Sequence, residues 1–136
     1  MLVTPRDHPL QARSELGFED TLDHDYIGLR PGTQLSLQLI RSATELGRHW
    51  PCRIQVSSYD ALCLMVEAGL GIAILPRRLA LSYSRALHIR PVELREPWAR
   101  RTFEVCCRPP RELASSTRLL LDHLLASSSP DPRAVS

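Results

Sequence analysis

A strand, helix, strand unit in the middle of the sequence limits which folds are open to this chain more than any other feature. Arg53–Val56 alternates polar and apolar residues, as a β-strand with one buried face does. Ser57 and Ser58 follow, and their hydroxyls can cap a helix over about Tyr59–Ala68. That helix is apolar nearly all round, which predicts deep burial. The continuous apolar run Leu70–Leu75, closed by a proline, is typical of a strand covered on both faces in a parallel sheet.

A second helix is predicted over about Thr33–Leu46. Apolar residues recur there at the spacing of one helical face, and Gly47 stands where a left-handed C-terminal cap is expected. Because strands and helices alternate, the sequence predicts an α/β fold with a largely parallel sheet. The same patterns predict strands at Leu2–Thr4, Tyr26–Leu29, Leu87–Arg90 and Thr102–Cys107, one or two helical turns within Arg77–Ser84, and a last helix from Leu113 to about Ala126.

Length and charge exclude several classes of protein. With 136 residues, the chain has the size of one domain. Its 17 basic residues, all arginine, are interspersed with 15 acidic ones, so no strong nucleic-acid-binding field is expected. No apolar run reaches the roughly 18 residues of a membrane-spanning helix, and the N-terminal residues do not resemble a secretory signal. The expected compartment is therefore the cytoplasm, with no membrane partner.

A family resemblance rests on the middle of the chain. The stretches Arg53–Ala61 and Val66–Pro76 resemble the second lobe of the effector-binding domain of LysR-type transcriptional regulators. Three further stretches agree with that domain in order, namely Val3–Leu10, Tyr26–Gln34 and Trp98–Cys107.

The resemblance implies a periplasmic-binding-protein-like (type II) effector domain whose first lobe is only partly present. Lobe two is expected at about residues 11–75, and crossover and lobe-one remnants at 1–10 and 76–126. Residues 127–136 are expected to form a disordered tail. The first half of lobe one and the family's winged helix-turn-helix DNA-binding domain have no counterpart in the sequence.

Two helix starts are the candidate ligand site. Ligands of α/β sheets bind beyond the carboxyl ends of the strands, where helix N-termini present free N–H groups. The alternative is that the side chains at these helix starts, Thr33, Ser57 and Ser58, only cap the helices. By resemblance, the residues expected to contact an effector are Gly32, Thr33, Gln34, Gln55, Ser57 and Ser58.

The resemblance to LysR-type effector-binding domains also implies a function for this chain. The chain is expected to sense a small-molecule inducer, such as a carboxylate, to assemble as a homo-oligomer, and to reach DNA only through a domain that it lacks. The alternatives are a solute-binding module of a transport system and a non-functional truncated remnant. An enzyme is not expected, because no G-x-S-x-G motif or cluster of titratable groups marks a catalytic centre.

Cofactors and metals are not expected either. His24 lies in the acidic segment 19–25, which reads as a solvated loop because neighbouring residues point in alternate directions and converge poorly on one ion. Cys106 and Cys107 are adjacent, and packing of one of them in the core is favoured over a redox role.

Overall fold

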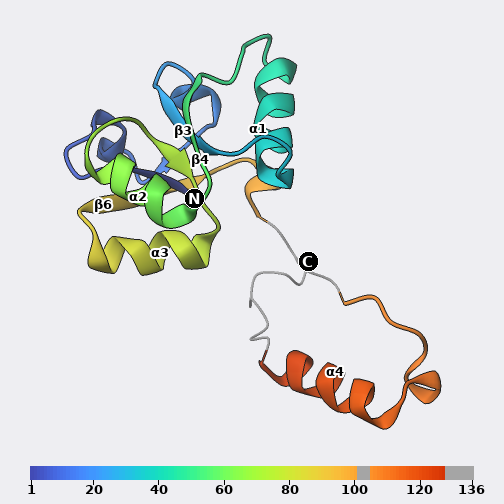
Figure 1. Cartoon of the computed structure of the whole chain (residues 1–136). Coiled ribbons are helices and arrows are strands. Elements are labelled where there is room, and N and C mark those ends of the chain that lie inside the picture. Colours follow the sequence, from blue (N-terminus) through green and yellow to red (C-terminus); the bar gives the residue numbers. More distant parts are fainter. Residues whose placement is uncertain (101–104, 128–136) are drawn as a thin grey trace. The chain divides into compact units, whose positions relative to one another are not determined.

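The computed structural model describes residues 1–100 and 105–127. The chain divides into two compact units, Met1–Arg101 and Thr102–Ser136. In the first unit, the helices are α1 (Gln34–Glu45), α2 (Tyr59–Glu67) and α3 (Arg77–Ala86), with short 3-10 turns at Pro9–Ala12, Glu19–Thr21 and Pro97–Ala99 (Figure 1). The strands are β1 (Leu2–Pro5), β2 (Glu15–Leu16), β3 (Tyr26–Leu29), β4 (Cys52–Val56), β5 (Ala73–Ile74) and β6 (Ile89–Leu94).

The strands form two sheets, and the larger one is mixed. Its order is β2-β6-β1-β5, with β1 antiparallel to both of its neighbours and β2 parallel to β6. The second sheet contains β3 and β4 in parallel. A single parallel bridge from Tyr26 to Ile72 links β3 to the residue before β5. The prediction of a largely parallel sheet is therefore wrong for the four-stranded sheet, because β1 runs against both strands that flank it.

Alternate residues along the strands supply two separate apolar clusters, as the period of two in a strand requires. Leu2 and Ile74 pack on one face with α1 and with Phe18. Val3 and Ala73 pack on the opposite face with α2 and α3. The first unit is thus layered, with α1 on one side of the strands and α2 and α3 on the other (Figure 1).

Two predictions of deep burial are only partly correct. Leu62, Cys63 and Val66 of α2 are buried, but Leu64 is 54% exposed, since one face of the helix is turned to solvent. The predicted strand Leu70–Leu75 contains only the two residues of β5, and Leu70 is 52% exposed. The run is therefore buried only from Ile72 onward, where it lies between β3 and β1.

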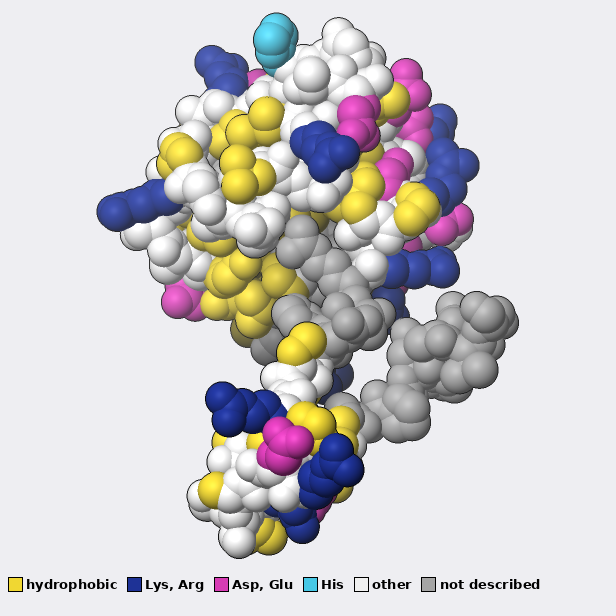
Figure 2. Space-filling model, turned by 90° about the vertical axis from the view of Figure 1, so that its right-hand side faces the viewer, with side chains coloured by type: hydrophobic (Ala, Val, Ile, Leu, Met, Phe, Trp, Pro, Cys, Tyr) yellow, Lys and Arg dark blue, Asp and Glu magenta, His cyan; other side chains and the backbone are white. Residues whose placement is uncertain are grey.

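The described part of the second unit contains a 3-10 turn at Pro110–Glu112 and the helix α4 (Ser115–Ser127), which is close to the predicted last helix. Its leucines Leu119, Leu120, Leu124 and Leu125 are exposed, and apolar side chains are visible on the surface in the space-filling view (Figure 2). Cys106 and Cys107 are both exposed, so the prediction that one of them packs in the core is wrong. Most of the predicted strand Thr102–Cys107 lies outside the described residues, as do residues 128–136 of the predicted disordered tail, and residues 105–107 have no regular structure.

Charged side chains are mixed on the molecular surface. On the face drawn in Figure 2, basic and acidic side chains alternate, with no large patch of one sign. Among the described helices, none is both long enough and apolar enough to cross a membrane.

Candidate functional site

The carboxyl ends of β3 and β4 lie side by side. The two strands pair in parallel, with Gly28 opposite Gln55 and Leu29 opposite Val56. The N–H of Arg30 continues the pairing beyond β3 by donating to the carbonyl of Val56 at 3.0 Å. Because adjacent strands are about 4.8 Å apart, the helices that follow both strands begin at the same edge of this sheet.

The first helix of this edge, α1, begins after a tight turn. Gly32 adopts φ 92°, a left-handed conformation that glycine reaches without strain. Thr33 then caps the helix: its Oγ1 accepts the N–H of Ser36 at 3.1 Å and lies 2.7 Å from the Ser36 hydroxyl. The amides of the first helical residues, Gln34 and Leu35, have no acceptor within the helix. They are available to an anion at this end of α1.

The second helix, α2, is capped by Ser58, whose Oγ accepts the N–H of Ala61 at 3.2 Å. Ser57 does not cap the helix, although the sequence allowed either serine to do so, and it is exposed. Asp60 stands in the first turn of α2, where a carboxylate is stabilised by the helix dipole. The Tyr83 hydroxyl donates to its Oδ1 at 2.5 Å, and this hydrogen bond raises the pKa of Tyr83 to about 12.

The predicted site residues therefore come together along one edge. Thr33 is half-buried and the other five, Gly32, Gln34, Gln55, Ser57 and Ser58, are exposed. Thr33 and Ser58 act as helix caps, so their predicted capping is confirmed, and whether they only cap their helices stays open. Contact with an effector stays a prediction for all six residues.

Two charged residues at this edge were missed by the sequence reasoning. Arg30 follows β3 directly and is exposed, and Asp60 occupies the start of α2. Because no acidic residue lies in the first turn of α1, an anion meets no like charge from that turn, whereas at α2 it meets Asp60. The available signal was the sequence order, in which Arg30 directly follows β3 and Asp60 is the second residue of α2.

Two cavities lie elsewhere in the first unit. One, of about 410 Å³, is lined mainly by the last turn of α1, the segment Gly17–Asp20 and the residues after β6. The other, of about 400 Å³, lies between the turn after β1 and the pair Glu67 and His88. The six predicted site residues line neither of these cavities. Over residues 1–100 and 105–127, no group of three or more His, Cys, Asp or Glu residues is placed to hold a metal ion.

The chain matches a protein-family model. The model described as the LysR substrate binding domain matches residues 1–129. The chain belongs to this family, as the resemblance implied. A comparison with curated protein sequences finds no match.

Solved structures support the same fold. The chain is similar to the effector-binding domain of QuiR in complex with shikimate, with 25% identity and a TM-score of 0.60 over 71% of this chain and 44% of that one. It is similar to the regulatory domain of CcmR from Synechocystis PCC6803 in complex with 2-PG, with 19% identity and a TM-score of 0.73 over 96% of this chain and 62% of that one. It also resembles the C-terminal domain of a probable LysR family regulator from Rhodococcus sp. RHA1, with 20% identity and a TM-score of 0.58 over 71% and 48% of the two chains.

These relatives confirm the predicted type II periplasmic-binding-protein-like fold. The chain spans less than two thirds of the length of each of the three solved domains. The boundaries predicted for the two lobes, about 11–75 for lobe two and 1–10 with 76–126 for lobe one, stay a prediction.

Proposed function

We propose that this chain is the effector-sensing part of a LysR-type transcriptional regulator and binds a small carboxylate at the edge where α1 and α2 begin. The observation that carries the proposal is the parallel pairing of β3 and β4, which sets two capped helix N-termini side by side. The proposal assigns no catalytic step to the chain and leaves DNA binding to a separate domain of such a regulator.

The electrostatics of the edge support an anion. Free N–H groups and the dipole at a helix N-terminus favour a carboxylate by about 0.3–1 kcal/mol. Arg30, which is exposed and stands between β3 and the turn into α1, adds a permanent positive charge to this segment. Since Asp60 already places a carboxylate at α2, we place the carboxylate of the effector at α1, with Gln55 and Ser57 contacting its polar groups from β4 and the turn after it.

The mechanism follows from differential affinity. An effector shifts a regulator between two arrangements only if it binds one of them more tightly. In this proposal the carboxylate is held by the amides of Gln34 and Leu35, and the rest of the molecule extends across the exposed edge. Because five of the six predicted contact residues are exposed, we expect weak binding by this chain, with a Kd on the order of millimolar and a binding free energy of about −4 kcal/mol.

Titration of the ¹⁵N-labelled chain with shikimate tests the proposal. Shikimate is a carboxylic acid, and its methyl ester is a matched probe without the charge. We expect the amide resonances of Gln34 and Leu35 to move with the acid and to stay in place with the ester. Equal shifts with both probes, or shifts confined to other parts of the chain, would contradict a carboxylate site at α1.

Gln34→Glu separates binding from folding. The new carboxylate at the start of α1 raises the free energy of unfolding by about 0.3–1 kcal/mol through the helix dipole, yet it repels an anionic ligand. We expect higher stability and loss of the shikimate shifts, while Gln34→Ala keeps the shifts. A Gln34→Glu variant that binds as well as the original chain would refute the position of the carboxylate.

The remaining expectations are part of the same proposal. The family match favours a regulator over a module of a transport system. Assembly as a homo-oligomer is tested by light scattering on the purified chain, and a cytoplasmic location by fractionation of cells. A cooperative unfolding transition of the chain would argue against a non-functional remnant.

A further inference from the structure

The cavity lined by the last turn of α1 lies at the opposite end of this helix from the proposed effector edge. Its volume is about 410 Å³, which is within the range of small-molecule sites. Ser42, Glu45 and Leu46 at the C-terminal end of α1 form one wall. Since a helix rises about 1.5 Å per residue, Ser42 and Glu45 lie about 12–17 Å along α1 from Gln34, so the cavity forms a site separate from the proposed effector edge.

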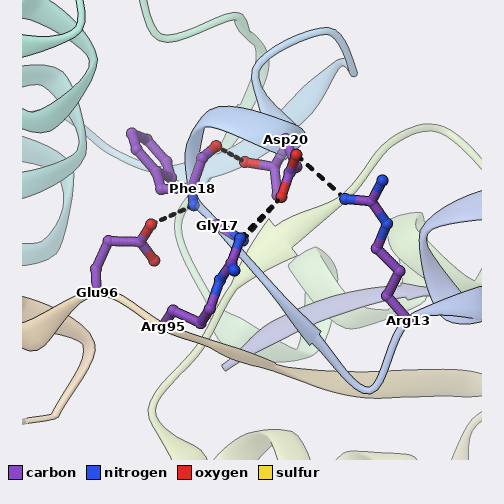
Figure 3. A network of polar contacts seen from close by, with 7 residues as sticks. Arg13, Gly17, Phe18, Asp20, Arg95 and Glu96 are labelled. Atoms are coloured by element: carbon purple, nitrogen blue, oxygen red, sulfur yellow. Dashed lines mark hydrogen bonds and ion pairs between the residues drawn. The ribbon is translucent and has the colours of Figure 1, made fainter.

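Acidic side chains dominate its lining. Arg95 is the single basic residue among the described lining residues, and four are acidic: Glu19, Asp20, Glu45 and Glu96. Arg95 is itself engaged, because it forms an ion pair with Asp20 at 3.6 Å, and Asp20 also lies 3.3 Å from Arg13 (Figure 3).

The carboxylates of the lining are not all neutralised. Glu45 pairs with Arg41 at 3.0 Å. Within the described part of the chain, no ion pair neutralises Glu19 or Glu96. The cavity therefore presents negative charge to whatever enters it.

Glu96 is the residue whose environment most requires a partner. Its Oε1 accepts the backbone N–H of Phe18, and Figure 3 shows Glu96 and Arg95 approaching the Gly17–Asp20 turn together. Its Oε2 is buried and has no hydrogen-bond partner in the part of the chain that the structure describes. A desolvated carboxylate oxygen without a donor is costly. A cation in the cavity lowers that cost through its charge, without contact with the buried oxygen.

The other walls favour the same kind of ligand. Trp98 lines the cavity and is held in place by an edge-to-face contact with Phe18, with ring centroids 5.4 Å apart. An indole face attracts ammonium and guanidinium groups. The C-terminal end of α1 adds the negative end of a helix dipole.

We propose that this cavity binds a small organic cation carrying an ammonium or guanidinium group, with Glu96 as its main counter-charge and Trp98 as its aromatic wall. The anionic lining, the unpartnered carboxylate oxygen and the aromatic wall select a cation from among small molecules of similar size. The site is independent of the effector edge, so either can exist without the other.

The test uses butylguanidinium and its uncharged counterpart butylurea. The chain has two tryptophans, so the ¹H–¹⁵N spectrum contains two indole signals, which a Trp98→Phe variant assigns. Trp50 packs on Tyr26 and does not line the cavity, so its signal is an internal control. We expect butylguanidinium to move the Trp98 signal and leave that of Trp50 in place, and butylurea to move neither.

Variants identify the counter-charge. Gln at position 96 still offers an oxygen to the Phe18 N–H, so we expect Glu96→Gln to fold and to weaken butylguanidinium binding by at least about tenfold. Glu112→Gln removes the same charge from a residue that lines neither cavity and should bind like the original chain. If Glu96→Gln fails to fold, Glu19→Gln decides, with an expected loss of about threefold.

Three results would overturn the proposal: equal shifts with butylurea, unchanged affinity in Glu96→Gln, or, where that variant does not fold, unchanged affinity in Glu19→Gln.

Discussion

Replacement of Gly71 by alanine should loosen the connection between β3 and β5. A Cβ at this position would lie 2.6 Å from the carbonyl oxygen of Asp25. That same oxygen accepts the N–H of Ile72 at 2.9 Å, and the Ile72 carbonyl accepts the N–H of Ile27 at 2.8 Å. The backbone must separate here, which weakens two hydrogen bonds of about 0.5–1.5 kcal/mol each and adds a strain of about 1–3 kcal/mol. We expect a total loss of about 2–6 kcal/mol in the free energy of unfolding.

Urea unfolding followed by tryptophan fluorescence measures this loss. Both tryptophans, Trp50 and Trp98, belong to the unit Met1–Arg101, so the signal reports on that unit. Gly69→Ala is the matched control, because Gly69 has φ 78° but nothing within 4 Å of an added Cβ. It should lose only about 1 kcal/mol, from the left-handed conformation. If Gly71→Ala is no less stable than Gly69→Ala, the close approach to β3 does not stabilise the fold as described.

Three further predictions concern α2 and its contact with α3. Ser58→Ala removes the helix cap and should lower the free energy of unfolding by about 1 kcal/mol in the same urea assay. Leu62 is buried, so Leu62→Ala should lower the free energy of unfolding by about 2–5 kcal/mol. Leu64 is exposed, so Leu64→Ala should change it by no more than about 0.5 kcal/mol. Equal losses in the two variants would contradict the described orientation of α2. Tyr83 should ionise near pH 12 when absorbance at 295 nm is followed, and Asp60→Asn should return its pKa toward the ordinary value, since the Asp60 carboxylate holds the hydroxyl proton. Because the folded pKa of Tyr83 is raised, the stability from this group is complete below about pH 10 and is lost as the pH rises toward 12.

Local signals predicted the helices well. The helix expected over Thr33–Leu46 is α1 with its two caps, and Gly47 has the left-handed φ of 68° that a C-terminal glycine provides. Ser58 caps α2 as one of two candidate serines. These features depend on residues within one or two turns of each other, so the sequence contains all the information that sets them.

Strand pairing and the cavity could not be predicted in the same way. An apolar run shows that a strand is buried, but not which strand it contacts or in which direction, so the antiparallel position of β1 was missed. The helix starts of the effector edge were found because each follows its strand directly. The contact between Glu96 and Phe18 joins residues 78 positions apart, and no local pattern marks such a pair.

The position of β1 between β5 and β6 has a consequence for how the protein folds during synthesis. Leu2 pairs with Ile74 and with Val92, so β1 is synthesised before both of these partner strands and cannot pair with them until most of the first unit has followed it. Contacts between residues so distant in sequence make folding slow, since a long loop must close before they form. Until then β1 presents two unpaired edges, and this interval is when a nascent chain of this topology is most exposed to association with other chains.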